Sequence, residues 1–536
     1  MNNLDCQPRA ELDVVVVGAG FAGLYLLYRL RELGLSVRVL EAGSGPGGTW
    51  YWNRYPGARC DVLSMEYSYQ FSPELQTQWE WSERYATQPE ILRYINHVAD
   101  RFNLRDDLQF NTRVERAHFD DATGRWQITT DTDEGFNARF CVMATGCLSS
   151  TNLPDFPGLQ HFTGATYHTG RWPQAGVDFT GQRVGIIGTG SSAIQSIPHI
   201  AEQAAHLTVF QRTPSYSVPA RNAPLGDTEV ARIKADYPNF RARNRQMSFG
   251  VDFRVREESA LSVSSAERER EYAARWADGG LAFLGAFSDL LVNQASNDTA
   301  AEFIRRQILA VVSDPVTAEK LTPTQIVGCK RLCVDTGYYE TFNRSNVTLV
   351  DVSESPIEAI TAQGVQVAGQ DYPFDSLVFA TGFDAMTGAL AKIDIRGRAG
   401  CALSEKWAAG PRTYLGLGTA GFPNLFLVTG PGSPSVLTNM LPSIEQHADW
   451  IAACIAYVSS EKMKTIEATL AAEDAWVEHV NAVAHTTLYP SCNSWYLGAN
   501  VPGKPRVFMP YIGFPPYVAK CNQVAANGYE GFELAP

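Results

Sequence analysis

Two glycine-rich runs are the residues whose types and spacing predict chemistry most directly. The first is GAGFAG (18–23), which follows an apolar run at 12–17 and precedes a helical pattern and a second strand ending at Glu41. In such a β-α-β unit Gly18 permits a tight turn, Gly20 lets the backbone approach a pyrophosphate, and Gly23 lets helix and strand pack closely. Glu41 has the spacing of an acid that accepts hydrogen bonds from a ribose. The run therefore predicts a dinucleotide site.

The second run is GTGSSA (188–193), which follows an apolar strand at 183–187. Gly188, Gly190 and Ala193 occupy the fingerprint positions, and Ser191 is a further candidate cofactor-binding residue in the same run. The next strand ends in Gln-Arg212-Thr213 without an acid. A guanidinium in that place suits the extra 2′-phosphate of NADP and would not suit NAD. The alternative is a solvated arginine at a strand end.

One dinucleotide site has an acid at the end of its second strand, and the other has an arginine there. Two such sites on one chain imply that it binds FAD and NADPH, and hence that hydride passes from nicotinamide to flavin. The electrons then need an acceptor. A disulfide reductase would show two neighbouring cysteines near the first fingerprint, and none occurs there. This leaves molecular oxygen as the expected acceptor.

Strands and helices alternate around both glycine runs, and this pattern predicts an α/β fold. We expect two Rossmann-like dinucleotide-binding domains, one for FAD and one for NADP, with a helical insertion. The expected boundaries are 1–147 and 380–536 for the two parts of the FAD domain, 148–225 and 323–379 for the NADP domain, and 226–322 for the insertion. Repeated strand-Ala-Thr-Gly turns, at 144–146 and 380–382, suggest that the chain crosses twice between the domains.

Bulk composition excludes several classes. The chain of 536 residues has a net charge of −13, which argues against nucleic acid as a partner. We expect no membrane span, because no apolar run approaches the roughly 20 residues that a span needs. Without an N-terminal secretion signal, a cytoplasmic location is expected. The ten scattered cysteines predict reduced thiols, and no ligand spacing predicts a metal site.

Two aromatic runs lie outside the fingerprints. GGTWYWNRYPG (47–57) contains Gly48, Thr49 and Trp50, and reads either as a packed surface loop or as a wall around a planar cofactor ring. FTGATYHTGRWP (162–173) contains His168 and Trp172 between glycines and a proline. We interpret the second run as a joint that belongs to neither nucleotide-binding unit.

These runs carry a family resemblance. FTGATYHTGRWP resembles the FxGxxxHxxxWP signature of type I Baeyer–Villiger monooxygenases, and GGTWYWNRYPGARCD (47–61) resembles their second signature. The resemblance covers nearly the whole chain and is closest to the phenylacetone, steroid and cyclohexanone monooxygenase branch. It implies an NADPH- and O2-dependent enzyme that converts ketones (cyclic, aryl or steroid) into esters or lactones through a flavin C4a-peroxide and a Criegee adduct, with sulfides as a second substrate class.

The resemblance also implies residue roles. Arg331 matches the active-site arginine, whose charge would keep oxygen adducts anionic, and Asp61 matches its carboxylate partner. Lys330 joins Arg212 and Thr213 at the 2′-phosphate, and Trp495 resembles the tryptophan that contacts the nucleotide's ribose. The substrate pocket would be lined by Ser435, Val436, Leu437 and Met440. His168 and Trp172 would couple domain rotation to cofactor state.

Other interpretations stay open at this point. Asp61 could cap a loop, Arg331 could pair with Glu340 on the surface, and His168 could be a hydrogen-bonded structural histidine. Two other functions are compatible with the two fingerprints. One is a flavin monooxygenase that oxygenates nitrogen or sulfur, and the other is a non-catalytic redox sensor that binds both cofactors.

Overall fold

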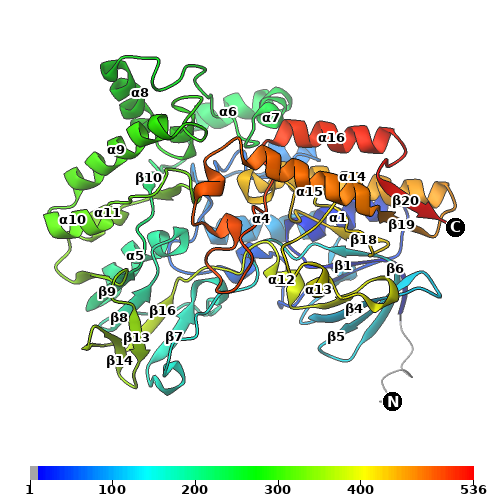
Figure 1. Cartoon of the computed structure of the whole chain (residues 1–536), viewed down its shortest axis with the longest axis horizontal. Coiled ribbons are helices and arrows are strands. Elements are labelled where there is room, and N and C mark those ends of the chain that lie inside the picture. The colour runs from blue at the N-terminus through cyan, green and yellow to red at the C-terminus, as the bar shows by residue number, and fades with distance from the viewer. Residues whose placement is uncertain (1–9) are drawn as a thin grey trace.

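The computed structural model describes residues 10–536, which gather around two main sheets (Figure 1). The first sheet has the order β17-β4-β5-β6-β1-β2-β3, with β18 beside β6. Strands β18, β6, β1, β2 and β3 run parallel to their neighbours in this half of the sheet. Its strands are β1 (Ala10–Val17), β2 (Val37–Leu40), β3 (Leu108–Gln109), β4 (Val114–Asp120), β5 (Arg125–Thr130), β6 (Gly135–Met143), β17 (Asp394–Arg396) and β18 (Leu425–Leu427).

The central strand β1 is covered on both faces. Val14 and Val16 pack in a core that includes α1 (Phe21–Glu32) and α14 (Met440–Ser460). Val15 and Val17 pack in a second core with residues of β4, β5 and β18. Alternate residues of a strand face opposite sides, so a strand covered on both sides is apolar throughout, as the VVVV run is.

The second sheet is parallel throughout, with the order β12-β9-β8-β16-β7. Helix α5 (Ser191–Gln203) follows β8 and leads into β9. A small antiparallel sheet and a two-stranded pair complete this half. The strands are β7 (Ala165–His168), β8 (Arg183–Ile187), β9 (His206–Gln211), β12 (Val347–Asp351), β16 (Ser376–Phe379), the antiparallel β13 (Ile357–Ile360), β14 (Gly364–Val367) and β15 (Gln370–Pro373), and the pair β10 (Ser217–Pro219) and β11 (Cys333–Asp335).

Residues 226–322 form helices, as expected. They are α6 (Asp227–Ala235), α7 (Tyr237–Gln246), α8 (Ser265–Asp278), α9 (Gln294–Val311) and α10 (Pro315–Leu321). Figure 1 shows α8, α9 and α10 above the second sheet, whereas α7 contacts α16 (Phe514–Ala526). Arg241 of α7 donates to the backbone oxygen of Glu66 and to Ser68 Oγ, at 3.0 and 2.6 Å. The insertion therefore bridges both halves of the molecule.

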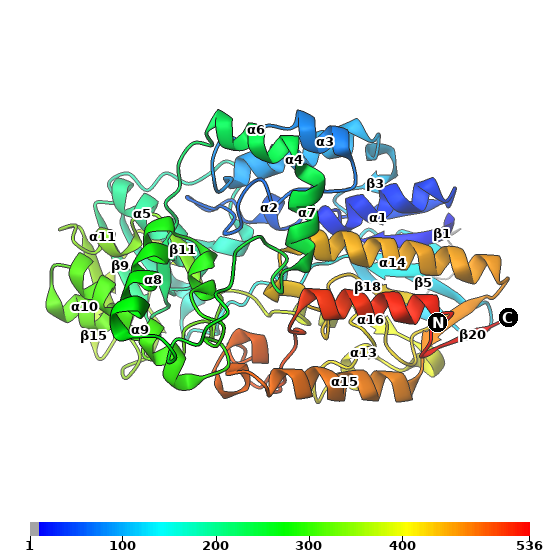
Figure 2. The ribbon, with the colours of Figure 1, turned by 90° about the horizontal axis from the view of Figure 1, so that it is seen from above.

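The remaining elements complete the first half. Figure 2 shows α14, α15 and α16 side by side beyond the first sheet, with the C-terminal strand β20 beside them. The elements of the first half not yet named are α2 (Thr49–Trp52), α3 (Pro73–Gln78), α4 (Gln88–Arg101), α12 (Gly388–Ala391), α13 (Leu403–Lys406), α15 (Leu470–Ala484), β19 (Thr465–Ala468) and β20 (Phe532–Ala535). Helix α11 (Tyr338–Thr341) instead packs on α5 of the second half.

Two chain segments cross between the halves and are tied together. The backbone N–H of Asn152 donates to Gly382 O at 2.9 Å, and that of Asp384 donates to Ser150 O at 2.8 Å. Thr151 and Phe383 form an antiparallel bridge between these bonds. The double crossing that the two Ala-Thr-Gly turns suggested is therefore present.

The α/β prediction with two Rossmann-type units and a helical insertion is confirmed, whereas the exact domain boundaries stay a prediction. One interpretation was wrong. Ala165–His168 is β7, the edge strand of the second sheet, so the joint run belongs partly to that unit. The run is too short and too polar for its sequence to predict a strand. Pairing with the buried strand β16 stabilises it in the fold. Within residues 10–536, none of the helices combines the length and apolar character that a membrane crossing requires.

The prediction of reduced thiols was also wrong for one pair. Cys329 and Cys492 form a disulfide, although 163 residues separate them in the sequence. Spacing along the chain could not reveal this pair, because only tertiary packing brings the two segments together. The other cysteines within residues 10–536 are free thiols.

A buried histidine predicts a specific pH dependence of stability. His447 Nδ1 accepts the N–H of Thr429 at 2.9 Å, and Nε2 lies 2.8 Å from Tyr517 Oη, which bonds to Leu415 O. Burial lowers the pKa of His447 to about 3. The unfolded chain takes up this proton near pH 6.5 but the folded chain does not, so stability falls as pH drops below 6.5.

We expect His447 to account for a loss of about 2 kcal/mol between pH 7 and pH 5. Denaturant unfolding at the two pH values measures the loss. The variant His447→Gln should be less stable at pH 7 but should show a smaller decrease toward pH 5. An equal decrease in both proteins would show that other groups cause it.

Candidate active site

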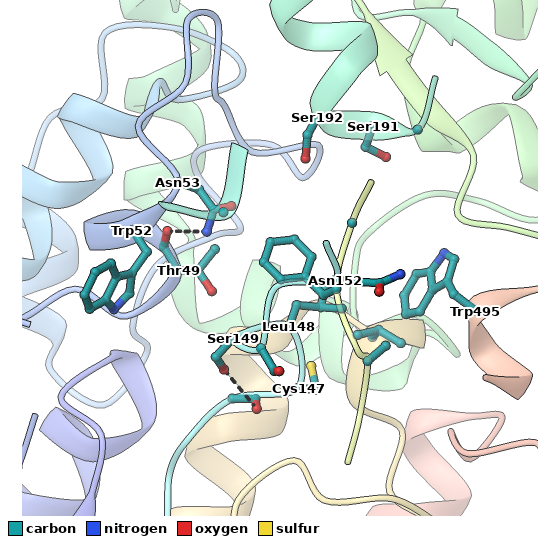
Figure 3. A pocket seen from close by; sticks show the side chains of 18 of the residues that line it. Thr49, Trp52, Asn53, Cys147, Leu148, Ser149, Asn152, Ser191, Ser192 and Trp495 are labelled. Carbon is teal, nitrogen blue, oxygen red and sulfur yellow. Dashed lines mark hydrogen bonds between the residues drawn. The ribbon is translucent and has the colours of Figure 1, made fainter. Parts of the chain in front are cut away.

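One large pocket runs between the two sheets and is lined by both glycine runs. Figure 3 shows Thr49 and Asn53 on one side of it, Ser191 and Ser192 above, and Trp495 on the opposite side. The pocket thus receives residues from the first half, the second half and the C-terminal segment. This arrangement could hold two dinucleotides with their reactive ends close together.

The first glycine run closes tightly on the strand end beside it. Gly18 has φ +106°, and a Cβ added there would lie 2.6 Å from Ala144 O. A Cβ on Gly23 would lie 1.9 Å from Gly18 O, so only glycine allows this helix–strand contact. Helix α1 has no side-chain cap at Gly20, which leaves its first N–H groups free for a phosphate. Gly18 and Gly20 line the pocket, whereas Gly23 lies behind it.

The second run repeats this geometry. Gly188 has φ +115°, and a Cβ there would lie 2.4 Å from Ala380 O. An added Cβ on Gly190 would meet no atom within 4 Å, so this position opens onto the pocket. Helix α5 also lacks a side-chain cap. The two helix N-termini therefore offer comparable sites for an anion.

This comparison predicts different effects for two alanine variants, one on stability and the other on nucleotide binding. Gly188→Ala should cost about 2 kcal/mol or more of stability, because it combines a positive φ with a backbone clash. Gly190→Ala, where φ is −85°, should fold normally but weaken nicotinamide nucleotide binding. Thermal unfolding and nucleotide titration measure the two effects. Equal stability of the two variants would contradict the steric argument.

Glu41 is buried at the pocket edge and is held by the backbone. Its Oε2 accepts the N–H of Ala19 at 2.9 Å, and its Oε1 accepts the N–H of Gly43 at 2.7 Å. The carboxylate also lines the pocket and retains lone pairs for further donors. It could therefore accept hydrogen bonds from a ribose, as the sequence predicted.

The aromatic loop at 47–57 packs against the first glycine run. A Cβ on Gly48 would lie 3.0 Å from Gly20 Cα, and Gly48 precedes the short helix α2. Trp50 Nε1 donates to Tyr67 Oη at 3.0 Å, which fixes the indole ring. Gly48, Thr49 and Trp50 all line the pocket. The loop is therefore a wall of the pocket, and its place around a planar cofactor ring stays a prediction.

Two cations face each other at the second fingerprint. Lys330 and Arg212 line the pocket with Thr213 and Ser191. Burial and, after it, the positive charge of Arg212 lower the pKa of Lys330. Across residues 10–536, neither side chain makes a hydrogen bond or salt bridge. Two like charges without a protein counter-ion favour an anionic ligand such as a phosphate monoester.

Arg331 and Asp61 form an ion pair in which the guanidinium donates from two nitrogens. Nε donates to Oδ2, and Nη2 donates to Oδ1 at 2.9 Å. Nη1 donates to Val436 O at 2.8 Å. Burial opposes the charge of Arg331, but the Asp61 carboxylate outweighs it and raises the pKa above its ordinary value. The surface pair with Glu340 is therefore excluded, and Arg331 remains a fixed cation.

An apolar chamber adjoins the large pocket, and Arg331, Val62, Val436 and Thr438 border both. Leu437 lines the chamber, Met440 lines the pocket, and Ser435 lines neither, because its hydroxyl is buried against Met386 Sδ. Sequence reasoning did not identify most chamber residues. Those missed include Phe249, Val251, Phe253, Leu281, Leu284, Tyr489 and Tyr496. The only available signal was the aromatic run FGVDF within a charged insertion.

His168 and Trp172 lie outside the pocket. His168 Nδ1 accepts the N–H of Gly170 at 3.0 Å, and Nε2 lies 3.4 Å from both Asn152 O and Thr381 Oγ1. Burial lowers the pKa of His168, so the ring is neutral near pH 7. Trp172 is buried with Tyr167 and Phe179 in the second core. His168 thus contacts both crossing segments, a placement that suits a joint and not an acid–base catalyst.

Comparison with known proteins assigns the family. A family model described as pyridine nucleotide-disulphide oxidoreductase matches residues 15–231. The chain is 44% identical to a Baeyer-Villiger monooxygenase of Pseudooceanicola batsensis over 97% of this chain and 96% of that protein. It is 43% identical to phenazine N-monooxygenase PhzNO1 of Lysobacter antibioticus, over 98% and 97%.

Solved structures agree with this similarity. An oxidized steroid monooxygenase bound to NADP superimposes with a TM-score of 0.94 at 54% identity, covering 98% of this chain and all of that one. The fold, the two nucleotide fingerprints and the similarity over the full length lead to one assignment. The chain belongs to the Baeyer–Villiger monooxygenases, a family of enzymes that use FAD and NADP.

Proposed function

We propose that this enzyme uses NADPH and O2 to insert one oxygen atom beside the carbonyl of an apolar ketone, giving an ester or lactone. The balance is ketone, O2, NADPH and a proton to ester, NADP⁺ and water. The observation that supports this most is the placement of Arg331. It is a fixed cation that borders both the cofactor pocket and the apolar chamber.

The residues of the pocket fit both cofactors. Uncapped helix N-termini follow Gly20 and Gly190, and the space beside Gly190 is open. Glu41 would hold the ribose of FAD, and the unpaired Lys330 and Arg212 would hold the 2′-phosphate of NADPH. When bound, FAD accepts hydride from NADPH and passes the electrons to O2.

Arg331 would stabilise negative charge on oxygen during attack on the carbonyl. A guanidinium carries five N–H donors, and three of its nitrogens already donate to Asp61 and Val436. The remaining donors could meet a developing oxyanion in a site that excludes most water. Asp61 would orient the guanidinium and hold it charged, and would not itself touch the reacting atoms.

Apolar side chains beside Arg331 support an apolar ketone as the substrate. The chamber has a volume of only about 40 Å³, smaller than a cyclic ketone, so the ketone would lie mainly in the adjoining large pocket, next to the chamber. Phe249, Phe253, Leu281 and Leu284 reach the chamber from the insertion, and Val62 and Leu437 reach it from the first half. Burial of the ketone's apolar part against such side chains favours binding by about 25 cal/mol per Å². We propose cyclic, aryl and steroid ketones as the substrate classes to compare, with molecular oxygen as co-substrate.

Trp495 and the joint residues have proposed supporting roles. Trp495 lines the pocket opposite Thr49 and Asn53 and would contact the nicotinamide nucleotide (Figure 3). His168 bonds between Asn152 and Thr381 in the two crossing segments. His168 would thereby couple movement of the two crossing segments to the position of the second half relative to the first.

A product screen tests the function. Enzyme reduced anaerobically by NADPH is mixed with O2 and a panel of cyclic, aryl and steroid ketones, and the products are separated by mass. The proposal expects esters or lactones for at least one ketone class. Hydrogen peroxide alone with every ketone would contradict it. An aromatic amine and a thioether are included because one relative is named a phenazine N-monooxygenase. Turnover of these two compounds and of no ketone would favour oxygenation of nitrogen or sulfur.

A further inference from the structure

The disulfide between Cys329 and Cys492 joins two segments that both border the cofactor pocket. Cys329 directly precedes Lys330 and Arg331, and it lines the pocket itself. Cys492 precedes Asn493 and Trp495, which also line the pocket. The two Cα atoms are 5.6 Å apart, within the range of ordinary disulfides.

Noncovalent contacts also hold the C-terminal segment, whose Tyr489, Tyr496 and Leu497 pack in one apolar cluster with Val436 and Leu437. Lys504 Nζ pairs with Asp384 at 2.5 Å, and Asn500 Nδ2 donates to Phe383 O at 2.7 Å. Near Cys492, the backbone N–H of Leu488 donates to Leu291 O of the insertion at 2.9 Å. The disulfide is therefore the covalent link that fixes Trp495 relative to Lys330.

The Lys330 segment lacks regular structure between α10 and β11. Asn297 holds it at Val327, and Arg331 holds it through Asp61, but Lys330 itself has no bonded partner within the described residues. A cross-link next to Lys330 thus adds a covalent restraint beside a side chain that has no polar partner of its own in the described part of the chain. Restricting two walls of a binding site before the ligand arrives lowers the entropy lost on binding.

We propose that the Cys329–Cys492 pair is a redox modification site that sets how tightly the enzyme holds its nicotinamide nucleotide. The disulfide form preorganises the Lys330 and Trp495 walls, and the dithiol form loosens them. A dithiol reductant opens the link by exchange, in which two thiols of the reductant become its disulfide and two protein thiols form. Hydrogen peroxide closes it, giving the disulfide and two molecules of water.

The pocket provides the route for exchange. Both cysteines are nearly inaccessible from outside, with 3% and 8% of their surface exposed, but Cys329 faces the pocket. A reductant therefore reaches the link through the nucleotide site. Bound NADP⁺ should slow reduction of the disulfide, because it occupies that route.

The inference rests on the proposed nucleotide-holding role of Lys330, and the experiment separates the two. Full-length enzyme with FAD is prepared in the oxidised and the dithiothreitol-reduced form, and peptide mapping determines whether residues 329 and 492 are cross-linked. NADP⁺ titration then gives the dissociation constant of each form. We expect a rise of about fivefold on reduction, and the same rise in Cys329→Ser, Cys492→Ser and the double variant.

Four controls make the result interpretable. Cys401→Ser removes an exposed free thiol and should retain the oxidised–reduced difference. The double variant should no longer respond to dithiothreitol, and saturating NADP⁺ should slow appearance of the two new thiols in the unmodified enzyme. Lys330→Ala should weaken NADP⁺ binding in either redox form.

Two outcomes would overturn the inference while leaving the proposed function intact. One is the absence of a 329–492 cross-linked peptide in the non-reduced enzyme. The other is an equal NADP⁺ affinity of oxidised and reduced enzyme when Lys330→Ala binds weakly. If Lys330→Ala binds NADP⁺ normally, the nucleotide-site assignment fails first.

Discussion

Replacing Arg331 by alanine should leave flavin reduction by NADPH near the unmodified rate and should lower ester formation by about 10³-fold or more. The hydride-transfer step needs the two nucleotide sites, which Arg331 borders but does not build. Attack on the ketone needs a cation beside the developing oxyanion, and Arg331 is the fixed cation shared by pocket and chamber. Anaerobic reduction kinetics and product yield measure the two steps separately.

Controls for this prediction must account for Asp61, the ion-pair partner of Arg331. Arg331→Ala leaves Asp61 unpaired with 23% of its side chain exposed, so a loss of stability is expected besides the catalytic effect. The double variant Arg331→Ala/Asp61→Ala removes both charges and should show the same catalytic loss without that penalty. Arg331→Lys keeps a charge but loses the two-point contact with Asp61, so its ester yield should be intermediate. Normal ester formation in the double variant would remove Arg331 from the mechanism.

Removing Arg212 or Lys330 should lower the preference for NADPH over NADH by about 10- to 100-fold for each residue. Both cations lack a protein counter-ion in the described structure and face the second fingerprint. NADH has no 2′-phosphate, so its kcat/KM should change little. The ratio of kcat/KM for the two nucleotides measures the effect.

Arg113 offers a matched control for the nucleotide preference. It lines the same pocket but lies next to Thr112, whose N–H donates to Glu41 O on the side of the first fingerprint. Arg113→Ala should leave the NADPH-to-NADH ratio unchanged. If Arg113→Ala changes the ratio as strongly as Arg212→Ala, the 2′-phosphate is held elsewhere.

The sequence predicted those parts of the protein that depend on local backbone geometry. Gly18 and Gly188 are required by a positive φ and a close carbonyl, and such requirements leave a fixed spacing in the sequence. The pairing of Arg331 with Asp61 was expected only through the family resemblance. These residues lie 270 positions apart, and no local pattern connects them.

The parts that sequence reasoning missed depend on tertiary packing. The chamber is closed by Phe249, Phe253 and Leu281, which belong to a charged insertion and reach Arg331 only after the insertion spans both halves. The disulfide joins segments 163 residues apart for the same reason. Strand β7 was missed because its stability comes from pairing with β16 and not from its own residues.

Turnover with ¹⁸O₂ tests the central claim most directly, because it follows the oxygen atom itself. NADPH, ¹⁸O₂ and a ketone from the productive class are incubated with the unmodified enzyme and with Arg331→Ala/Asp61→Ala, and the ester and peroxide are analysed by mass. The account predicts one ¹⁸O atom per ester with the unmodified enzyme, and with the variant labelled hydrogen peroxide and almost no ester. Labelled ester formed equally by both proteins would contradict the account.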